Sequence, residues 1–302
     1  MGNTDVVVRS HACKALAKIG EKAATTEVID ALANALMDTN VDVSSHACET
    51  LTKIGETAAN TQAINALIDA LGDTNIEVRS HACEAFTKVS EKAAIIELVN
   101  GFLKALGDAD ASVRLQTSQT LRKIDIKLVT IDAINALLKV LGDTNSYVRQ
   151  NVRETLGDIG KKAATIELIN GLVNALSDNN AHVRIGACWS LCKMGEKAAT
   201  VEVINGLANA LADSNIIVRE RACMCIASIS EKAATTKLIN ALVNALRDMV
   251  LDVRTAAIWA MRKLSERAAT TEMINGLLNA IRDNDADVRS QACIALGQIA
   301  EK

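Results

Sequence analysis

Residues 71–90 read Leu-Gly-Asp-Thr-Asn-Ile-Glu-Val-Arg-Ser-His-Ala-Cys-Glu-Ala-Phe-Thr-Lys-Val-Ser, and related stretches recur along the whole chain every 35 residues. The recurring valine forms a column of nine: Val8, Val43, Val78, Val113, Val148, Val183, Val218, Val253 and Val288. An arginine follows this valine in eight copies, and Ser44 is the exception. From the second copy on, an aspartate stands five residues before it: Asp38, Asp73, Asp108, Asp143, Asp178, Asp213, Asp248 and Asp283. A period of this length predicts a stacked array of repeats.

Each period contains two stretches with helical spacing. In the first, residues 23–36, the apolar side chains fall on one stripe of a 3.6-residue helix: Val28, Ile29, Leu32 and Leu36. In the second, residues 41–54, one face carries Val43, Ala47, Leu51 and Ile54. We call these the A helix and the B helix. The pattern predicts an all-α fold, a solenoid of antiparallel helix pairs in which each pair contacts mainly its neighbours.

Turn residues mark the ends of the predicted helices. An Asn or Asp precedes most B helices and can accept hydrogen bonds from the free amides there: Asn40, Asn75, Asp110, Asn145, Asn180, Asn215 and Asp285. Val250 occupies this position in one copy and lacks an acceptor. After the B helix, a glycine that tolerates a left-handed C-terminal turn is expected at Gly20, Gly55, Gly160 and Gly195.

The period divides residues 1–302 into one array of about 17 helices. A lone B helix at 5–19 precedes eight A-plus-B units at 23–55, 58–90, 93–125, 128–160, 163–195, 198–230, 233–265 and 268–300. The terminal helices resemble the internal ones, whereas solenoid ends usually carry a polar outer face. We therefore expect a segment of a longer array, an engineered protein, or ends covered by end-to-end self-association.

Composition narrows the class of protein. The chain has 302 residues, 49% of them hydrophobic, with a formal charge of −3, no proline and 8 cysteines. No apolar run reaches the roughly 18 residues of a membrane helix, and no secretion signal opens the sequence. These features predict a cytoplasmic protein in a reducing compartment, without a membrane partner and without a general preference for nucleic acid.

The repeated string resembles the HEAT-like repeats, in the short form found in phycobilin-lyase-like scaffolds. Its pattern L-x-D-x-N-x-x-V-R-x-x-A-x-x-x-L-x-x-I-G covers the entire chain and appears from Leu71 through Val78 and Arg79 to Val89. The resemblance implies a right-handed superhelix with B helices on the concave face. It also implies that the aspartate and arginine columns form a ladder between neighbouring units, for which the planar arginine fork is suited.

The exposed side of the B helices changes character along the array. One column holds Trp189, Met224, Trp259 and Ile294 in four consecutive units, where earlier units have polar side chains. Arg221, Lys193 and Lys263 frame it on the same helix faces. Tryptophan and methionine are favoured at binding hot spots, so this strip is the candidate site for a protein or peptide partner. The alternative is that neighbouring side chains cover the strip as an extension of the core.

Two further columns contain histidines and cysteines, side chains that can bind metal ions or react. His11, His46 and His81 lie one period apart, too far to converge on one metal ion, and we interpret them as a solvated polar groove. Six cysteines share a column beside a small alanine and are expected to be buried, free thiols: Cys13, Cys48, Cys83, Cys188, Cys223 and Cys293. No cofactor or metal ligand set is predicted.

The leading prediction is a non-enzymatic scaffold that binds a protein on the concave B-helix face. One alternative is a HEAT-like nucleic-acid binder or DNA glycosylase, which the two tryptophans permit but Glu154, Asp158 and Glu220 disfavour. Another is a structural spacer or engineered scaffold. The irregular stretch Asp125–Ile131, with Thr117, Ser118 and Arg153 in core columns nearby, marks a second contact site, a local bend or drift.

Overall fold

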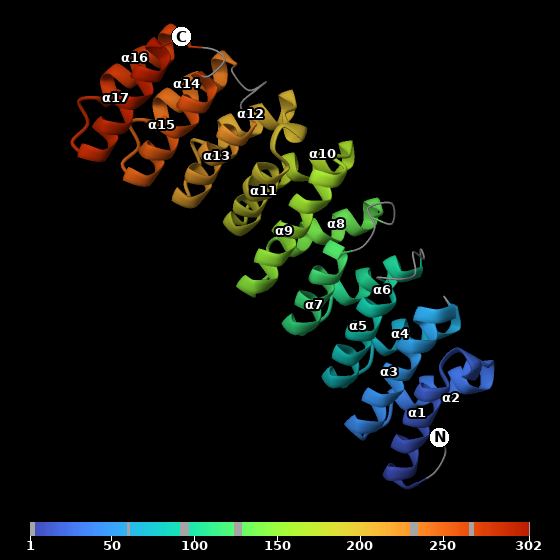
Figure 1. Ribbon diagram of the computed structural model, residues 1–302. Helices are drawn as coiled ribbons and strands as arrows, with labels where there is room; N and C mark the ends of the chain where they lie inside the picture. The colour runs from blue at the N-terminus through green and yellow to red at the C-terminus, as the bar shows by residue number, and fades with distance from the viewer. Residues whose placement is uncertain are drawn as a thin grey trace. The chain divides into compact units, whose positions relative to one another are not determined.

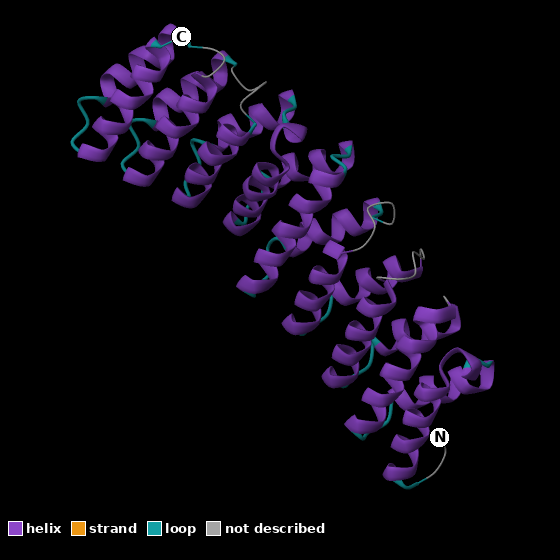
Figure 2. Ribbon diagram, viewed as in Figure 1, coloured by secondary structure: helices purple, strands orange, loops and turns teal. Residues whose placement is uncertain are grey.

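The computed structural model describes residues 4–58, 61–90, 97–123, 129–229, 235–265 and 269–301, and over these residues it contains helices and connecting turns but no strand (Figure 2). The B helices are α1 (Val6–Ile19), α3 (Val41–Ala58), α5 (Ile76–Ser90), α7 (Ala111–Lys123), α9 (Ser146–Lys162), α11 (Ala181–Met194), α13 (Ile216–Ser228), α15 (Leu251–Ser265) and α17 (Ala286–Ala300). The A helices are α2 (Thr26–Leu36), α4 (Thr61–Ala70), α6 (Glu97–Leu106), α8 (Ile131–Val140), α10 (Ile166–Ala175), α12 (Val201–Ala210), α14 (Thr236–Ala245) and α16 (Thr271–Ala280). The predicted α-solenoid is therefore confirmed.

The chain divides into two compact units. The first comprises Met1–Val140 with Asn145–Asn151, and the second comprises Leu141–Thr144 with Val152–Lys302. Within each unit, B helices pack on B helices and A helices on A helices, so that two layers run side by side (Figure 1). In the second unit α11, α13, α15 and α17 form the B layer, and α10, α12, α14 and α16 form the A layer.

The core lies between the two layers, at the columns that the periodicity predicts. In the pair α12 and α13, Val203 and Leu207 of the A helix and Val218, Ala222 and Ile226 of the B helix are all completely buried. Burying each large aliphatic side chain contributes about 1.5–3 kcal/mol. The same columns repeat in the other units, which is why a sequence with few aromatic residues still forms a continuous core.

Hydrogen bonds from side chains fix where the helices begin. The Asn215 Oδ1 atom accepts from the Ile217 and Val218 amides at 2.9 and 3.3 Å, as predicted for the B helices. The A helix α2 begins at Thr26 rather than at residue 23, because the Thr25 hydroxyl caps it by accepting from the Val28 amide at 3.4 Å. A short 3₁₀ turn at Gly20–Ala23 precedes this cap.

The predicted glycine caps are right at two positions and wrong at two. Gly20 and Gly195 have φ of 65° and 61° and end α1 and α11. Gly55 and Gly160 instead lie inside α3 and α9, which run on to Ala58 and Lys162. At Gly160 a β-carbon would collide with the Met194 side chain, so this glycine allows close packing rather than a turn.

The aspartate and arginine columns form the expected ladder between neighbouring helix-pair repeats. Arg184 donates from Nε and Nη2 to the two carboxylate oxygens of Asp213 at 2.7 and 2.9 Å, and from Nη1 to the Asp178 and Asn179 carbonyls at 2.7 and 3.1 Å. Each such arginine therefore bonds both its own turn and the aspartate of the next unit. The same rung joins Arg9 to Asp38, Arg79 to Asp108, Arg219 to Asp248 and Arg254 to Asp283.

Ser44 breaks the ladder where it replaces the arginine. Its hydroxyl donates to the Val41 carbonyl of its own helix at 3.0 Å, and it does not reach the next unit. An arginine at position 44 would bind Asp73 of the next repeat. The Asp73 side chain keeps only its local hydrogen bond, in which Oδ1 accepts from the Asn75 amide at 2.7 Å. Among the described side chains no cation pairs with Asp73.

Candidate protein-interaction surface

The strip residues lie on the solvent-facing side of the B layer in the second unit. Trp189, Met224, Trp259 and Ile294 belong to α11, α13, α15 and α17, which pack on one another in that order. In each helix the strip residue directly follows a residue of the cysteine column. The packed helix therefore holds the strip residue in place. The side chains differ in exposure along the strip.

Trp189 is half-buried between two cations. The Arg153 guanidinium carbon and the Lys193 Nζ atom each lie 5.2 Å from the centre of the indole ring. Lys193 also pairs with Asp158 at 2.8 Å. Cations over an indole face are attracted by the ring quadrupole, so this arrangement fixes the tryptophan. Lys193, predicted to frame the strip, therefore partly covers it.

Met224 is also half-buried, and Arg221 turns toward it. The Nη1 atom of Arg221 lies 3.3 Å from the Met224 Sδ atom, three residues along the same helix. The Met224 carbonyl lies 3.8 Å from the Cys192 sulfur of α11. Arg221 is thus placed beside the strip as the sequence predicts.

Trp259 and Ile294 form the open end of the strip. Their side chains are 40% and 44% exposed, although Ile258, Ala260 and Ala295 beside them in the core columns are buried. Arg262 links α15 to α17 beside them, because its Nε and Nη1 atoms donate to the Gln298 and Gln291 amide oxygens at 3.0 and 3.3 Å. Lys263, the third predicted framing residue, is half-buried on α15.

Sequence reasoning missed Arg153 and Arg262 as parts of this surface. Arg153 occupies the cysteine column, where a buried charge is unexpected, and the residue 36 positions later is Trp189. Arg262 and Gln298 are separated by the same interval. Residues 36 apart face each other across neighbouring B helices, so two departures from the repeat at this spacing are the signal that could have identified both contacts.

Two rings of the histidine column bond to their own helices. The Nδ1–H of His11 donates to the Val7 carbonyl at 2.8 Å, and that of His46 donates to the Asp42 carbonyl, so both rings bond their own helices. His81 lines a small groove with Glu49 on the neighbouring helix. In the described part of the chain, no three metal-ligating side chains come together.

The cysteine column is buried with one exception. Cys13, Cys48, Cys83, Cys188 and Cys223 are buried free thiols, whereas Cys293 is exposed. The prediction is wrong for Cys293 because no described helix packs on this face of α17. Burial raises the pKa of the Cys83 thiol to about 11 and that of Cys188 to about 12, so these thiols stay protonated and unreactive.

The irregular region around residues 117–131 is only partly described. Residues 124–128 lie outside the described residues, so the interpretation of Asp125–Ile131 stays open. Thr117 and Ser118 are completely buried and donate to carbonyls of their own helix, Val113 at 2.7 Å and Leu115 at 2.8 Å. These substitutions are therefore accommodated in the core by local hydrogen bonds.

Family models of HEAT repeats match almost the whole sequence. One model matches residues 1–61, 29–103, 99–172 and 204–296, and a second matches residues 168–198. No curated protein matches the chain by sequence. No described helix has the length and apolarity needed to cross a bilayer.

Solved karyopherin structures share the architecture. A crystal structure of a Kap121p mutant superposes with a TM-score of 0.74 at 14% identity, over 99% of this chain and 36% of that one. Kap121p bound to Nup53p gives 0.72 at 13% over 99% and 36%. Kap95p with RanGDP gives 0.64 at 16% over 98% and 44%. The chain spans less than half of each of these proteins, and at such identities the likeness shows the fold alone.

Proposed function

Because the chain belongs to the HEAT-repeat family, we propose that it is a non-enzymatic scaffold that binds a protein or peptide partner on the solvent-facing side of its B helices. The observation that carries the proposal is the strip, where apolar residues replace polar ones at one column of four consecutive helices. Solved relatives in fold support a protein partner, since Kap121p has been crystallised bound to Nup53p and to the SUMO protease Ulp1p.

The open end of the strip is the anchor. Trp259 and Ile294 offer apolar surface on rigid helices, and such residues dominate binding energy when a partner excludes water from them. Trp189 and Met224 are already enclosed by Arg153, Lys193 and Arg221, so they contribute a fixed, cationic border. Binding to this surface needs little ordering of the protein, which reduces the entropic cost of association.

The proposal is tested with peptides selected from a random display library against the whole chain. Alanine at both Trp259 and Ile294 is expected to weaken their binding at least about tenfold, because two hot-spot side chains are lost. Ile217→Ala is the matched control, since this isoleucine is equally exposed, at 47%, but lies outside the strip. Equal affinity for the wild type and the double variant would remove the strip as the binding site.

The nucleic-acid alternative receives no support from the strip. Lys193 is paired with Asp158, and Glu220 directly precedes Arg221 on α13, so the surface carries acidic groups among its cations. We further propose a reducing intracellular compartment, in keeping with the free cysteines, which are mostly buried.

A further inference from the structure

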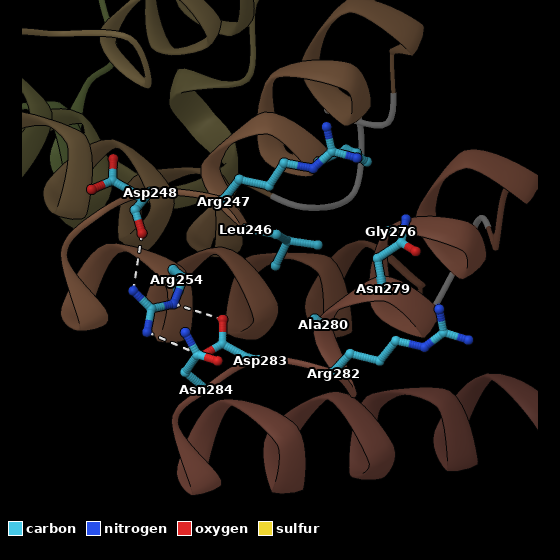
Figure 3. A pocket seen from close by; sticks show the side chains of 11 residues that line it. Leu246, Arg247, Asp248, Arg254, Gly276, Asn279, Ala280, Arg282, Asp283 and Asn284 are labelled. Atoms are coloured by element: carbon cyan, nitrogen blue, oxygen red, sulfur yellow. Dashed lines mark hydrogen bonds and ion pairs between the residues drawn. The ribbon is translucent and has the colours of Figure 1, made fainter.

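The A layer of the second unit carries a groove that the strip does not involve. It lies between the ends of α14 and α16 and has a volume of about 300 Å³. Its floor is apolar, formed by Val243, Leu246 and Ala280, and Gly276 lets the two helices approach closely. Figure 3 shows Arg247 and Arg282 on its two sides, with Leu246, Gly276 and Ala280 between them.

The groove has a surplus of positive charge. Its two carboxylates are already bound by ladder arginines, Asp248 by Arg219 at 2.6 Å and Asp283 by Arg254 at 2.9 Å. Arg247 and Arg282 are exposed, and neither guanidinium is bonded to a described side chain. Two guanidinium groups that face solvent on both sides of an apolar floor are complementary to a carboxylate beside an apolar side chain.

Carboxamides extend this surface from helix to helix. Asn244 and Asn279 are exposed at equivalent positions of α14 and α16, and Asn279 lines the groove while Asn244 lines the neighbouring one. A carboxamide both donates and accepts hydrogen bonds, which matches the N–H and C=O groups of an extended peptide. A phosphate backbone would instead require cations repeated along the array.

The repeat supplies an internal comparison. The equivalent groove between α10 and α12 is lined by Leu176, Gly206 and Asn209, but it has Ser177 and Ala212 where the later groove has the two arginines. The shape is thus common to the scaffold, whereas the charge belongs to the groove between α14 and α16.

We infer that this groove binds an acidic, extended peptide segment of a partner protein, with a carboxylate between Arg247 and Arg282 and its main chain along Asn244 and Asn279. The site lies in the A layer and is separate from the strip on the B helices. A partner that contacts both layers gains affinity from the two sites together.

The test uses a fluorescein-labelled twelve-residue peptide of alternating Asp and Leu, its Asn and Leu counterpart, and a twelve-nucleotide single-stranded DNA, measured by anisotropy with the full chain. We expect the acidic peptide to bind at least tenfold more tightly than the other two, and R247A/R282A to lose that preference. Both arginines are exposed, so equal melting temperatures check that the variant is folded.

The reverse change makes the result specific. S177R/A212R should raise the number of acidic peptides bound above that of the wild type, while W259A/I294A should leave this binding unchanged. The inference is overturned if R247A/R282A binds the acidic peptide as well as the wild type does, or if the DNA binds as tightly as the peptide. Failure here with intact strip binding leaves the proposed function standing.

Discussion

The ion pair between Arg219 and Asp248 joins two neighbouring helix-pair repeats. The Arg219 guanidinium, through its hydrogen bond, holds the pKa of the Asp248 carboxyl below its usual range, against the opposing effect of burial. Asp38 is shifted in the same direction by Arg9. A carboxyl with a lowered folded-state pKa stabilises the fold above its unfolded pKa of about 3.9, and this contribution disappears as the pH falls through the folded value.

We therefore expect Asp248→Asn to lower the free energy of unfolding at pH 7 by about 1–3 kcal/mol, because Arg219 loses a charged acceptor. In the wild type the Val250 amide donates to the Asp248 Oδ1 atom at 2.9 Å, and the asparagine oxygen can accept the same bond. Urea unfolding should show the difference from the wild type shrinking as the pH falls below the unfolded pKa of about 3.9.

Asp73→Asn is the control for that experiment. Asp73 keeps the same backbone bond but faces Ser44 in place of an arginine. It should cost little at pH 7, because no guanidinium loses a charged acceptor. A loss at Asp73 as large as that at Asp248 would mean that the ladder is not the source of the stability.

At the scale of one helix, two glycines of the B helices differ in the space around them. Gly160 lies in α9 where a β-carbon would meet the Met194 side chain, whereas at Gly297 in α17 nothing lies within 4 Å of such an atom. Both have ordinary helical backbones, since in the described chain only Gly20 and Gly195 have positive φ.

Gly297→Ala should raise the free energy of unfolding by about 0.5–1 kcal/mol, because alanine restricts the unfolded chain and fits the helix. Gly160→Ala should lower it by about 1 kcal/mol or more, because Met194 must move. Chemical denaturation of both variants checks the pair, and a gain at Gly160 would show that α9 and α11 are packed more loosely than described.

The repeat made the elements predictable, and departures from it made parts of the surface hard to predict. Val218, Ala222 and the Asn215 cap follow from the period alone, because the same role recurs in most copies, with departures such as Val250 and Thr117. The A-helix start was missed because the Thr25 cap lies inside the apolar pattern. The cover over Trp189 was missed because Arg153 acts across 36 residues and in one unit only.

At the scale of the molecule, the outer faces of the first and last helices differ from the interior. Val8 is 48% exposed, whereas Val218 and Val253 in the same column are fully buried. Cys293 is exposed where Cys188 and Cys223 are buried. We propose that in this 302-residue chain these two faces associate end to end, since each presents the columns that neighbouring units bury.

Light scattering over a concentration series should then show a molar mass that rises with concentration. Val8→Glu or Cys293→Glu should suppress the rise, because a charge would be buried at the junction. Ile217→Glu, at an exposed position inside the array, should not. A strictly monomeric wild type over the whole series would contradict end-to-end association.

The central claim, that a partner lies on the strip, is tested most directly by tryptophan emission. Both tryptophans of the chain belong to the strip, so in Trp189→Phe the emission reports Trp259 alone. Titration with a peptide selected against the whole chain should shift this emission to shorter wavelength and saturate at the Kd of direct binding, because the indole loses water. Binding at full affinity with unchanged Trp259 emission would place the partner elsewhere.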